Sequence, residues 1–242
     1  SDEKKSIWGA VKSAVGEEVY VVAGATNYST QESIIGVEDA LLAGADAVLL
    51  TVPYYNKPTQ EGLFEHFSAI AEATRLPCIL YNVPSRTSLN MQAEIVTRLS
   101  KIDNIIGIKE ASSDMDQISK IINSTDDDFI VWSGNDADII SVMALGGDGV
   151  VSVAAHFVGN DISKMINFIS DGDMNAANDI NSKLIDLYNV LFIESNPIPV
   201  KWGLNHLGFK AGAPRLPLLE PVQNTRKDMA NILNDLKENF YK

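Results

Sequence analysis

The apolar residues of this chain fall into short, nearly uninterrupted runs separated by longer amphipathic stretches. Strands that are continuously apolar are typical of a parallel sheet covered on both faces. Stretches with apolar residues every three or four positions are typical of helices that bury one face. We therefore predict strands at 19–24, 47–52, 78–83, 105–110, 129–134 and 149–154. We predict helices between them, near 30–43, 60–74, 91–100, 114–123 and 136–145.

This alternation predicts an α/β fold with a parallel sheet and right-handed crossovers. A doubly wound sheet and a (β/α)8 barrel are the two common solutions. No Gly-x-Gly-x-x-Gly sequence follows any predicted strand, which disfavours a dinucleotide-binding domain. From about residue 157 onward the pattern contains only helices, near 160–170, 173–192, 198–207 and 222–239. The first of them would complete the last βα unit, and the other three would form a C-terminal appendage.

The start of the chain predicts a helix at once. Ser1 has the side chain of an N-cap, and Asp2 and Glu3 would lie in the first turn, where acidic residues are favourable. The alternation contains six strands and not the eight of a complete barrel. We therefore expect the first two strands of such a barrel to be missing from this sequence.

Composition and charge narrow the class of protein. The chain has 242 residues, of which 45% are hydrophobic and 21% charged, as in ordinary globular proteins. The net charge is −13 and no basic stripe is present, so we expect no nucleic-acid partner. No apolar run reaches transmembrane length and no signal peptide is visible, so we expect no membrane association and a cytoplasmic location. The three histidines lack metal-ligand spacing, and we expect no metal site.

Lys109 is the most informative single residue. It ends the apolar run that begins at Ile105, with a strand behind it and a loop ahead of it. Burial disfavours an ammonium group, and a neutral amine at the rim of a pocket can form a Schiff base with a carbonyl compound. In an acidic protein, Lys109 would also attract an anionic substrate locally. The alternative is a strand-end lysine that extends to water.

Other reactive side chains follow the ends of the same strands, where the active sites of barrels lie. Tyr81 could relay protons beside an amine, and Arg86 could grip a carboxylate with its planar guanidinium. Tyr54 and Tyr55 lie in a proline-bounded loop, which suggests a subunit contact or a reach into a site. Each also has a simpler interpretation: a satisfied strand tyrosine, a solvated arginine, and packing within a turn.

Four segments, taken together, resemble the dihydrodipicolinate synthase family of pyruvate-dependent class I aldolases. They are Pro-Tyr-Tyr-Asn-Lys-Pro-Thr-Gln-Glu-Gly at 53–62, Tyr-Asn-Val-Pro-Ser-Arg-Thr at 81–87, Gly-Ile-Lys-Glu-Ala-Ser at 107–112 and Asn-Pro-Ile-Pro-Val-Lys at 196–201. The resemblance implies a (β/α)8 TIM barrel. Residues 1–171 would carry strands 3–8 of the family fold, and residues 172–242 a C-terminal domain of three helices.

The resemblance also implies a reaction and its catalytic residues. Pyruvate would condense with L-aspartate 4-semialdehyde to give 4-hydroxy-tetrahydrodipicolinate, in the lysine (diaminopimelate) pathway. Lys109 matches the Schiff-base lysine, so that no cofactor is required beyond pyruvate held covalently as an imine. Tyr81 matches the proton relay. Tyr55 matches the tyrosine that enters the site of a neighbouring subunit, which implies a homo-oligomer, either a dimer or a dimer of dimers.

The remaining matches concern substrate binding. Arg86 corresponds to the arginine that binds the semialdehyde carboxylate, and Gly134 and Val151 to positions around the bound pyruvate. Asn135 stands where the family usually has an acidic residue, although Asp136 fits.

Two alternatives remain open. One is a sister aldolase, such as N-acetylneuraminate lyase or a 2-keto-3-deoxy sugar-acid aldolase, which shares the lysine and tyrosine. Arg86 and the Glu-Ala-Ser sequence at 110–112 favour the synthase. The other is an N-terminally truncated, inactive homologue, because the family's Thr-Thr-Gly-Glu motif, which completes the relay and binds the pyruvate carboxylate, is not found in this sequence.

Overall fold

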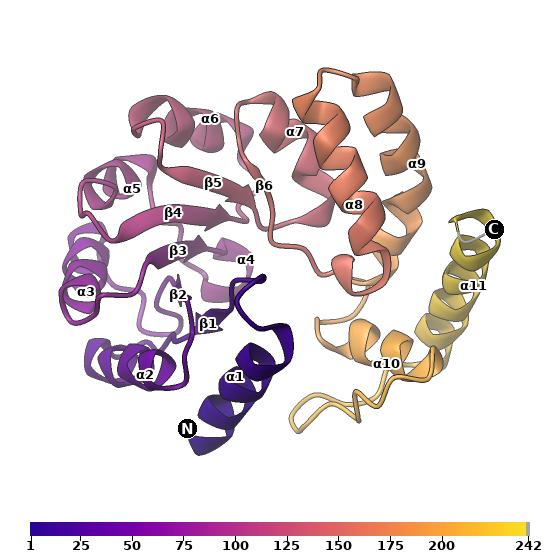
Figure 1. The fold of residues 1–242 in the computed structure, drawn as a ribbon, viewed down its shortest axis with the longest axis horizontal. Helices are drawn as coiled ribbons and strands as arrows, with labels where there is room; N and C mark the ends of the chain where they lie inside the picture. Colours follow the sequence, from indigo (N-terminus) through magenta and orange to yellow (C-terminus); the bar gives the residue numbers. More distant parts are fainter. Residues whose placement is uncertain (241–242) are drawn as a thin grey trace. The chain divides into compact units, whose positions relative to one another are not determined.

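Six parallel strands form one sheet in the computed structural model, which describes residues 1–240. Each strand pairs with those that precede and follow it in the sequence, from β1 to β6 (Figure 1). The strands are β1 (Val22–Gly24), β2 (Ala47–Thr51), β3 (Cys78–Asn82), β4 (Ile105–Glu110), β5 (Ile130–Ser133) and β6 (Gly149–Val150). The predicted α/β fold with a parallel sheet is therefore confirmed.

Helices alternate with the strands and continue after the last one. They are α1 (Asp2–Val15), α2 (Thr30–Leu42), α3 (Gln60–Glu72), α4 (Pro84–Thr87), α5 (Ala93–Leu99), α6 (Met115–Ser124), the 3-10 turn η1 (Asp136–Asp138), α7 (Ile139–Ala144), α8 (Ala155–Ser170), α9 (Met174–Val190), α10 (Ile198–His206) and α11 (Gln223–Phe240). The short helix α4 was not predicted. Within residues 1–240, no helix combines the length and hydrophobicity needed to cross a membrane.

The main core lies between the sheet and helices α2, α3, α5 and α6, which run along one face of the sheet (Figure 1). Leu50, Leu80 and Ile108 stand side by side on adjacent strands and are fully buried against these helices. Side chains alternate between the two faces of a strand. The next residue on each strand therefore points to the opposite face, which is where the candidate site lies.

The first and last strands are shorter than predicted. The backbone N–H of Val21 donates to Asp46 Oδ2 at 2.7 Å, before β1 begins. Residues 151–154 were predicted as strand, and this was wrong, because the N–H groups of Val153 and Ala154 donate to Asp136 Oδ2 and not to a neighbouring strand. Ser1 takes the N-cap position of α1, but its side chain makes no capping hydrogen bond.

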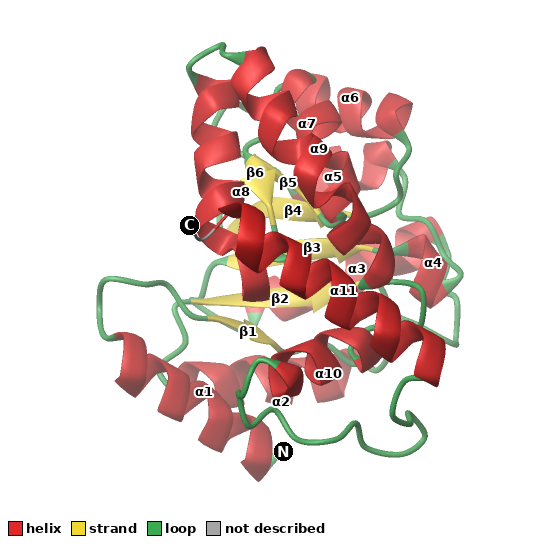
Figure 2. Cartoon of the chain, turned by 90° about the vertical axis from the view of Figure 1, so that its right-hand side faces the viewer, coloured by secondary structure: helices red, strands yellow, loops and turns green. Residues whose placement is uncertain are grey.

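The chain divides into two compact units. The first comprises residues 1–134 and 141–150 and holds the sheet; the second comprises 135–140 and the chain from 151 onward. In the second unit α8 packs against α9, and α10 packs against α11 (Figure 2). The boundary predicted at 171–172 separates the barrel of the family fold from a C-terminal helical domain. It stays a prediction.

A buried histidine links two helices of the first unit. His66 on α3 lies 2.8 Å from the hydroxyl of Thr30 on α2, measured from its Nδ1. Burial lowers the pKa of His66 from 6.5 to about 4. Because the unfolded chain takes up this proton at a higher pH than the folded protein, the stabilisation that depends on neutral His66 is lost as the pH falls from 6.5 towards 4.

We predict that His66→Gln flattens the pH dependence of stability in this window. Each unit of pKa shift corresponds to about 1.4 kcal/mol, so between pH 7 and pH 4 the wild type should lose about 3 kcal/mol more free energy of unfolding than His66→Gln. Urea unfolding at several pH values measures it. Parallel curves for the wild type and His66→Gln would contradict the assignment of this histidine as buried and neutral.

The strand end at Gly134 requires glycine. Its N–H donates to the carbonyl of Glu110 at 2.6 Å. A Cβ at this position would lie 2.5 Å from the Cβ of Ala111. Gly134→Ala should therefore lower the free energy of unfolding by about 1–3 kcal/mol, as overpacking does.

Gly24 on β1 is the matched control, since a Cβ built there meets no atom within 4 Å. Urea unfolding should show Gly24→Ala close to the wild type. Equal stability of the two variants would refute the close approach of Gly134 to Ala111.

Candidate active site

The two central candidates, Tyr81 and Lys109, are direct neighbours across the sheet. Tyr81 on β3 pairs with Lys109 on β4, and the same row includes Thr51 on β2 and Trp132 on β5. Paired residues of parallel strands point to the same face. This row therefore lies on the face opposite the helix-covered core, one residue beyond Leu80 and Ile108.

An irregularity in the pairing of β3 with β4 produces this alignment. Cys78 pairs with Ile105, but Ile79 pairs with Gly107, so that one residue of β4 is skipped. With unbroken pairing, Tyr81 would face Ile108. The irregularity brings Lys109 opposite Tyr81, and this could not be read from the sequence.

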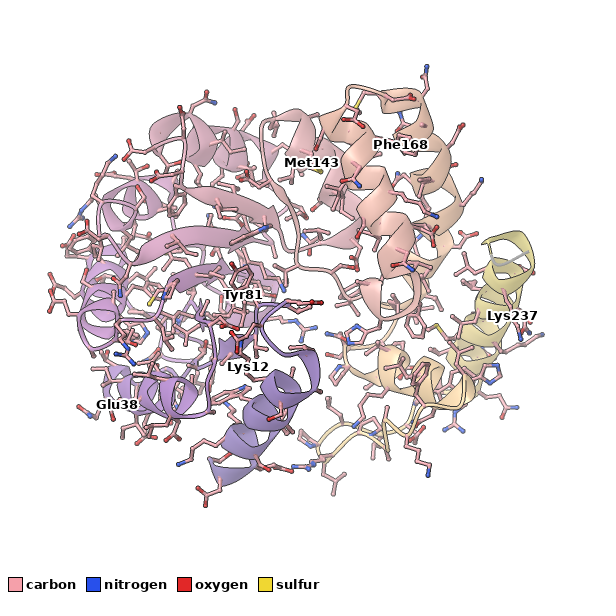
Figure 3. All side chains as sticks on the ribbon, in the orientation of Figure 1. Lys12, Glu38, Tyr81, Met143, Phe168 and Lys237 are labelled. Atoms are coloured by element: carbon pink, nitrogen blue, oxygen red, sulfur yellow. The ribbon has the colours of Figure 1, made fainter. Side chains whose placement is uncertain are left out.

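Lys109 and Tyr81 are in contact. The Nζ atom of Lys109 lies 4.4 Å from the centroid of the Tyr81 ring, a distance typical of a cation–π pair. Both side chains are half-buried. Tyr81 is labelled in Figure 3. The structure thus brings together the predicted nucleophile and the predicted proton relay.

The surroundings of Tyr81 keep its hydroxyl protonated. Burial raises the pKa of Tyr81, and the positive charge of Arg86 opposes this rise. A phenol with a raised pKa is neutral at physiological pH. It can therefore donate its proton to a reacting atom, and it can relay protons by taking one up on its oxygen as its own proton is passed on.

Arg86 lies on α4, directly after β3, and its side chain is exposed. Pro84 opens this helix in its first turn, where proline's fixed backbone angle is favourable. The guanidinium acts electrostatically on Tyr81, as the direction of its influence on the tyrosine pKa indicates. Arg86 thus lies just beyond the end of β3, the strand that carries the proton relay Tyr81.

The loop before α3 holds Tyr55 in an unusual conformation. Tyr55 has φ 71° and an exposed fraction of 88%. Its neighbours are anchored: the rings of Tyr54 and Tyr28 meet edge to face at 5.4 Å, and Asn56 Nδ2 donates to the carbonyl of Tyr28 at 3.1 Å. A non-glycine residue at positive φ is uncommon and marks a locally constrained position. The side chain of Tyr55 therefore projects from an anchored loop.

Two threonines lie at the end of the row that is nearest to β1: Thr51, which belongs to the row, and Thr26, which follows β1. Thr26 Oγ1 accepts a hydrogen bond from the N–H of Thr51 at 2.7 Å and lies 3.2 Å from the Thr51 hydroxyl. Thr51 pairs with Tyr81 in the sheet. Neither threonine was predicted as a site residue. The available signal in the sequence was their position: Thr51 lies at the end of a predicted strand, and Thr26 lies just after one.

The last two predicted site residues have different positions. Gly134 directly follows β5 in the first unit, where its N–H is bonded to Glu110 at the end of β4. Val151 directly follows β6 and is exposed, in the second unit. Within residues 1–240, no cluster of three or more histidine, cysteine, aspartate or glutamate side chains could hold a metal ion.

The other face of β3 and β4 carries a buried polar group that was not predicted. Glu110 and Asn82, each the residue after a row member, are almost completely buried there. Burial raises the pKa of Glu110, while hydrogen bonds from Asn82, Ser112 and Gln117 act in the opposite direction. Both residues lie within predicted strands, at 78–83 and 105–110, but nothing in the sequence indicated that their side chains would meet.

Similarity to known proteins covers nearly the whole chain. The profile of the Dihydrodipicolinate synthetase family matches residues 1–236. A 4-hydroxy-tetrahydrodipicolinate synthase of Dehalococcoides mccartyi (strain CBDB1) is 53% identical over 224 residues, which cover 93% of this chain and 75% of that protein. The enzyme of the same name from Moorella thermoacetica is 46% identical over 237 residues, covering 98% of this chain and 80% of that protein.

Solved structures agree with this result. The crystal structure of dihydrodipicolinate synthase from Thermotoga maritima superimposes with a TM-score of 0.95 at 37% sequence identity. The match covers 97% of this chain and 81% of that one. Sequence and fold together show that the chain belongs to the dihydrodipicolinate synthetase family.

Proposed function

We propose that this protein is a 4-hydroxy-tetrahydrodipicolinate synthase, which condenses pyruvate with L-aspartate 4-semialdehyde through a Schiff base on Lys109. The contact between Lys109 Nζ and the Tyr81 ring is the observation that carries this proposal. An amine and a neutral phenol side by side provide a nucleophile and a proton carrier in one place. The family membership names the substrates.

In the first half of the reaction, the neutral amine of Lys109 adds to the ketone carbon of pyruvate. The ketone oxygen leaves as water with the two amine hydrogens, and an imine forms. Tyr81 carries protons between the nitrogen and the departing oxygen, for which its protonated hydroxyl is suited. Loss of a methyl proton from the protonated imine then gives an enamine.

In the second half, the enamine carbon adds to the aldehyde carbon of the semialdehyde, whose oxygen takes up a proton and becomes the 4-hydroxyl group. The amino group of the semialdehyde then replaces Lys109 at the imine carbon, which closes the ring and frees the lysine. Arg86 binds the semialdehyde carboxylate, since a guanidinium can make two parallel hydrogen bonds to it. This chemistry uses no cofactor beyond the pyruvate imine itself.

The barrel, the helical domain, the surroundings of pyruvate and the subunit contact are further parts of this proposal. The six strands are six of the eight in a (β/α)8 barrel, which the superposition on family structures supports. Residues 1–171 belong to that barrel and 172–242 to a helical domain, of which residues 241 and 242 lie outside the described part of the chain. Gly134 and Val151 contribute to the surroundings of pyruvate. Tyr55, exposed on an anchored loop, enters the site of a second subunit in a cytoplasmic homo-oligomer.

Lys109 should form a covalent adduct when pyruvate and borohydride are added together. Reduction fixes the imine as a secondary amine, which peptide mass spectrometry locates. Lys109→Ala should yield no adduct, whereas Lys101→Ala, which removes an exposed lysine paired with Asp126, should label like the wild type. An adduct that persists in Lys109→Ala would exclude this lysine as the nucleophile.

Arg86→Ala should impair use of the semialdehyde far more than imine formation. A hydrogen bond to a charged group contributes about 1.5–3 kcal/mol, so kcat/KM for the semialdehyde should fall by about 10- to 150-fold. Steady-state kinetics gives this ratio, and borohydride trapping gives the pyruvate half-reaction. A comparable loss in both measurements would reject the proposed role.

A further inference from the structure

Four polar side chains form a connected cluster on the helix-covered face of β3 and β4, opposite the face that carries Tyr81 and Lys109. We call Asn82, Asn90, Glu110 and Gln117 the Glu110 cluster. Asn82 is 0% exposed, Glu110 1% and Gln117 8%. Burying a carboxylate so deeply is costly unless its oxygens accept hydrogen bonds. The cluster therefore requires a structural or functional reason.

The hydrogen bonds of this cluster are matched in polarity. Glu110 accepts from Asn82 Nδ2 at 3.0 and 3.1 Å and from Gln117 Nε2 at 3.2 Å. The N–H of Ser112 donates to Glu110 Oε1 at 2.7 Å. All of these partners are donors, so the arrangement suits an ionised carboxylate, which is an acceptor only.

Asn82 and Gln117 have no freedom to reverse their amide groups. Asn82 Oδ1 already accepts from the N–H of Met91 at 3.0 Å. Gln117 Oε1 accepts from Asn90 Nδ2 at 2.8 Å. Both amides must therefore direct their NH2 groups at Glu110. A glutamine at position 110 would bring an NH2 group against other donors.

The position of the cluster relates it to the reactive pair. Asn82 follows Tyr81, Glu110 follows Lys109, and Asn82 pairs with Glu110 in the sheet. The cluster thus joins β3 to β4 one residue beyond the pair, on the opposite face. At the start of the two strands the pairing is irregular, because one residue of β4 is skipped between Ile105 and Gly107. Regular pairing along the whole length of β3 and β4 therefore does not hold their register.

We propose that Glu110 is a positioning residue: through Asn82 and Gln117 it holds β3 and β4 in the register that places Lys109 Nζ against Tyr81. This inference rests on the proposed Schiff-base function of Lys109. Glu110 acts through the backbone of its own strand and does not touch substrate. The burial that raises its pKa is the cost of this arrangement, and the four donated hydrogen bonds offset it.

The test compares three variants for the rate of imine formation with saturating pyruvate, measured by borohydride trapping per folded molecule. Glu110→Gln replaces the carboxylate by a mismatched amide. Gln117→Leu removes one donor to it. Asn104→Ala is the control, because Asn104 precedes the same strand at its other end and its side-chain amide donates to the carbonyls of Ala71 and Thr74.

Misplacement of reacting groups by about 1 Å can cost on the order of 100-fold in rate. We therefore expect Glu110→Gln to lower the saturating rate by about 10- to 100-fold, and Gln117→Leu to lower it by a smaller factor. Asn104→Ala should lower the urea midpoint yet trap pyruvate at the wild-type rate. If Glu110→Gln does not fold, Gln117→Leu compared with Asn104→Ala decides the question.

The outcomes separate the two proposals. Wild-type rates in folded Glu110→Gln and Gln117→Leu, or an equal loss in Asn104→Ala, would overturn the positioning role while leaving the Schiff base intact. Failure of the wild-type protein to trap pyruvate would overturn the proposed function, and the positioning role with it.

Discussion

The register between β3 and β4 is the constraint on which the site depends. Side chains alternate from one face of a strand to the other, so a slip of one residue would move Lys109 to the helix-covered face. The lysine would then lie on the face of the fully buried Leu80, and Ile108, its neighbour on β4, would turn away from the helices. The skipped residue between Ile105 and Gly107 is thus what makes an amine and a phenol neighbours.

Burial has different effects on the two faces of β3 and β4. On the open face, partial burial keeps the Tyr81 hydroxyl protonated, while Arg86 limits the rise in its pKa. On the covered face, deeper burial makes the hydrogen bonds of Glu110 strong, because a low dielectric strengthens matched donors and acceptors and penalises unmatched ones. The same two strands therefore carry a reactive pair and the polar cluster behind it.

The sequence predicted the elements better than their contacts. The apolar runs at 47–52, 78–83 and 105–110 became strands at nearly those bounds, because continuous burial leaves a clear pattern. Tyr81 and Lys109 could be assigned to strand ends by the same pattern. Their pairing could not, because it depends on a local irregularity that no periodicity records.

Other features were hidden for similar reasons. The Glu110 cluster joins residues that are up to 35 positions apart, and no local pattern in the sequence links them. The strand predicted at 149–154 ends at Val150 because Asp136, distant in sequence, accepts hydrogen bonds from the N–H groups of Val153 and Ala154. Long-range side-chain hydrogen bonds decided both cases.

A crystal structure of the protein soaked with pyruvate would test the central claim most directly. We predict continuous electron density from Lys109 Nζ to the second carbon of pyruvate, with the Tyr81 hydroxyl within hydrogen-bonding distance of the bound group. Pyruvate joined to a different lysine, or Tyr81 turned away from a Lys109 adduct, would contradict the account.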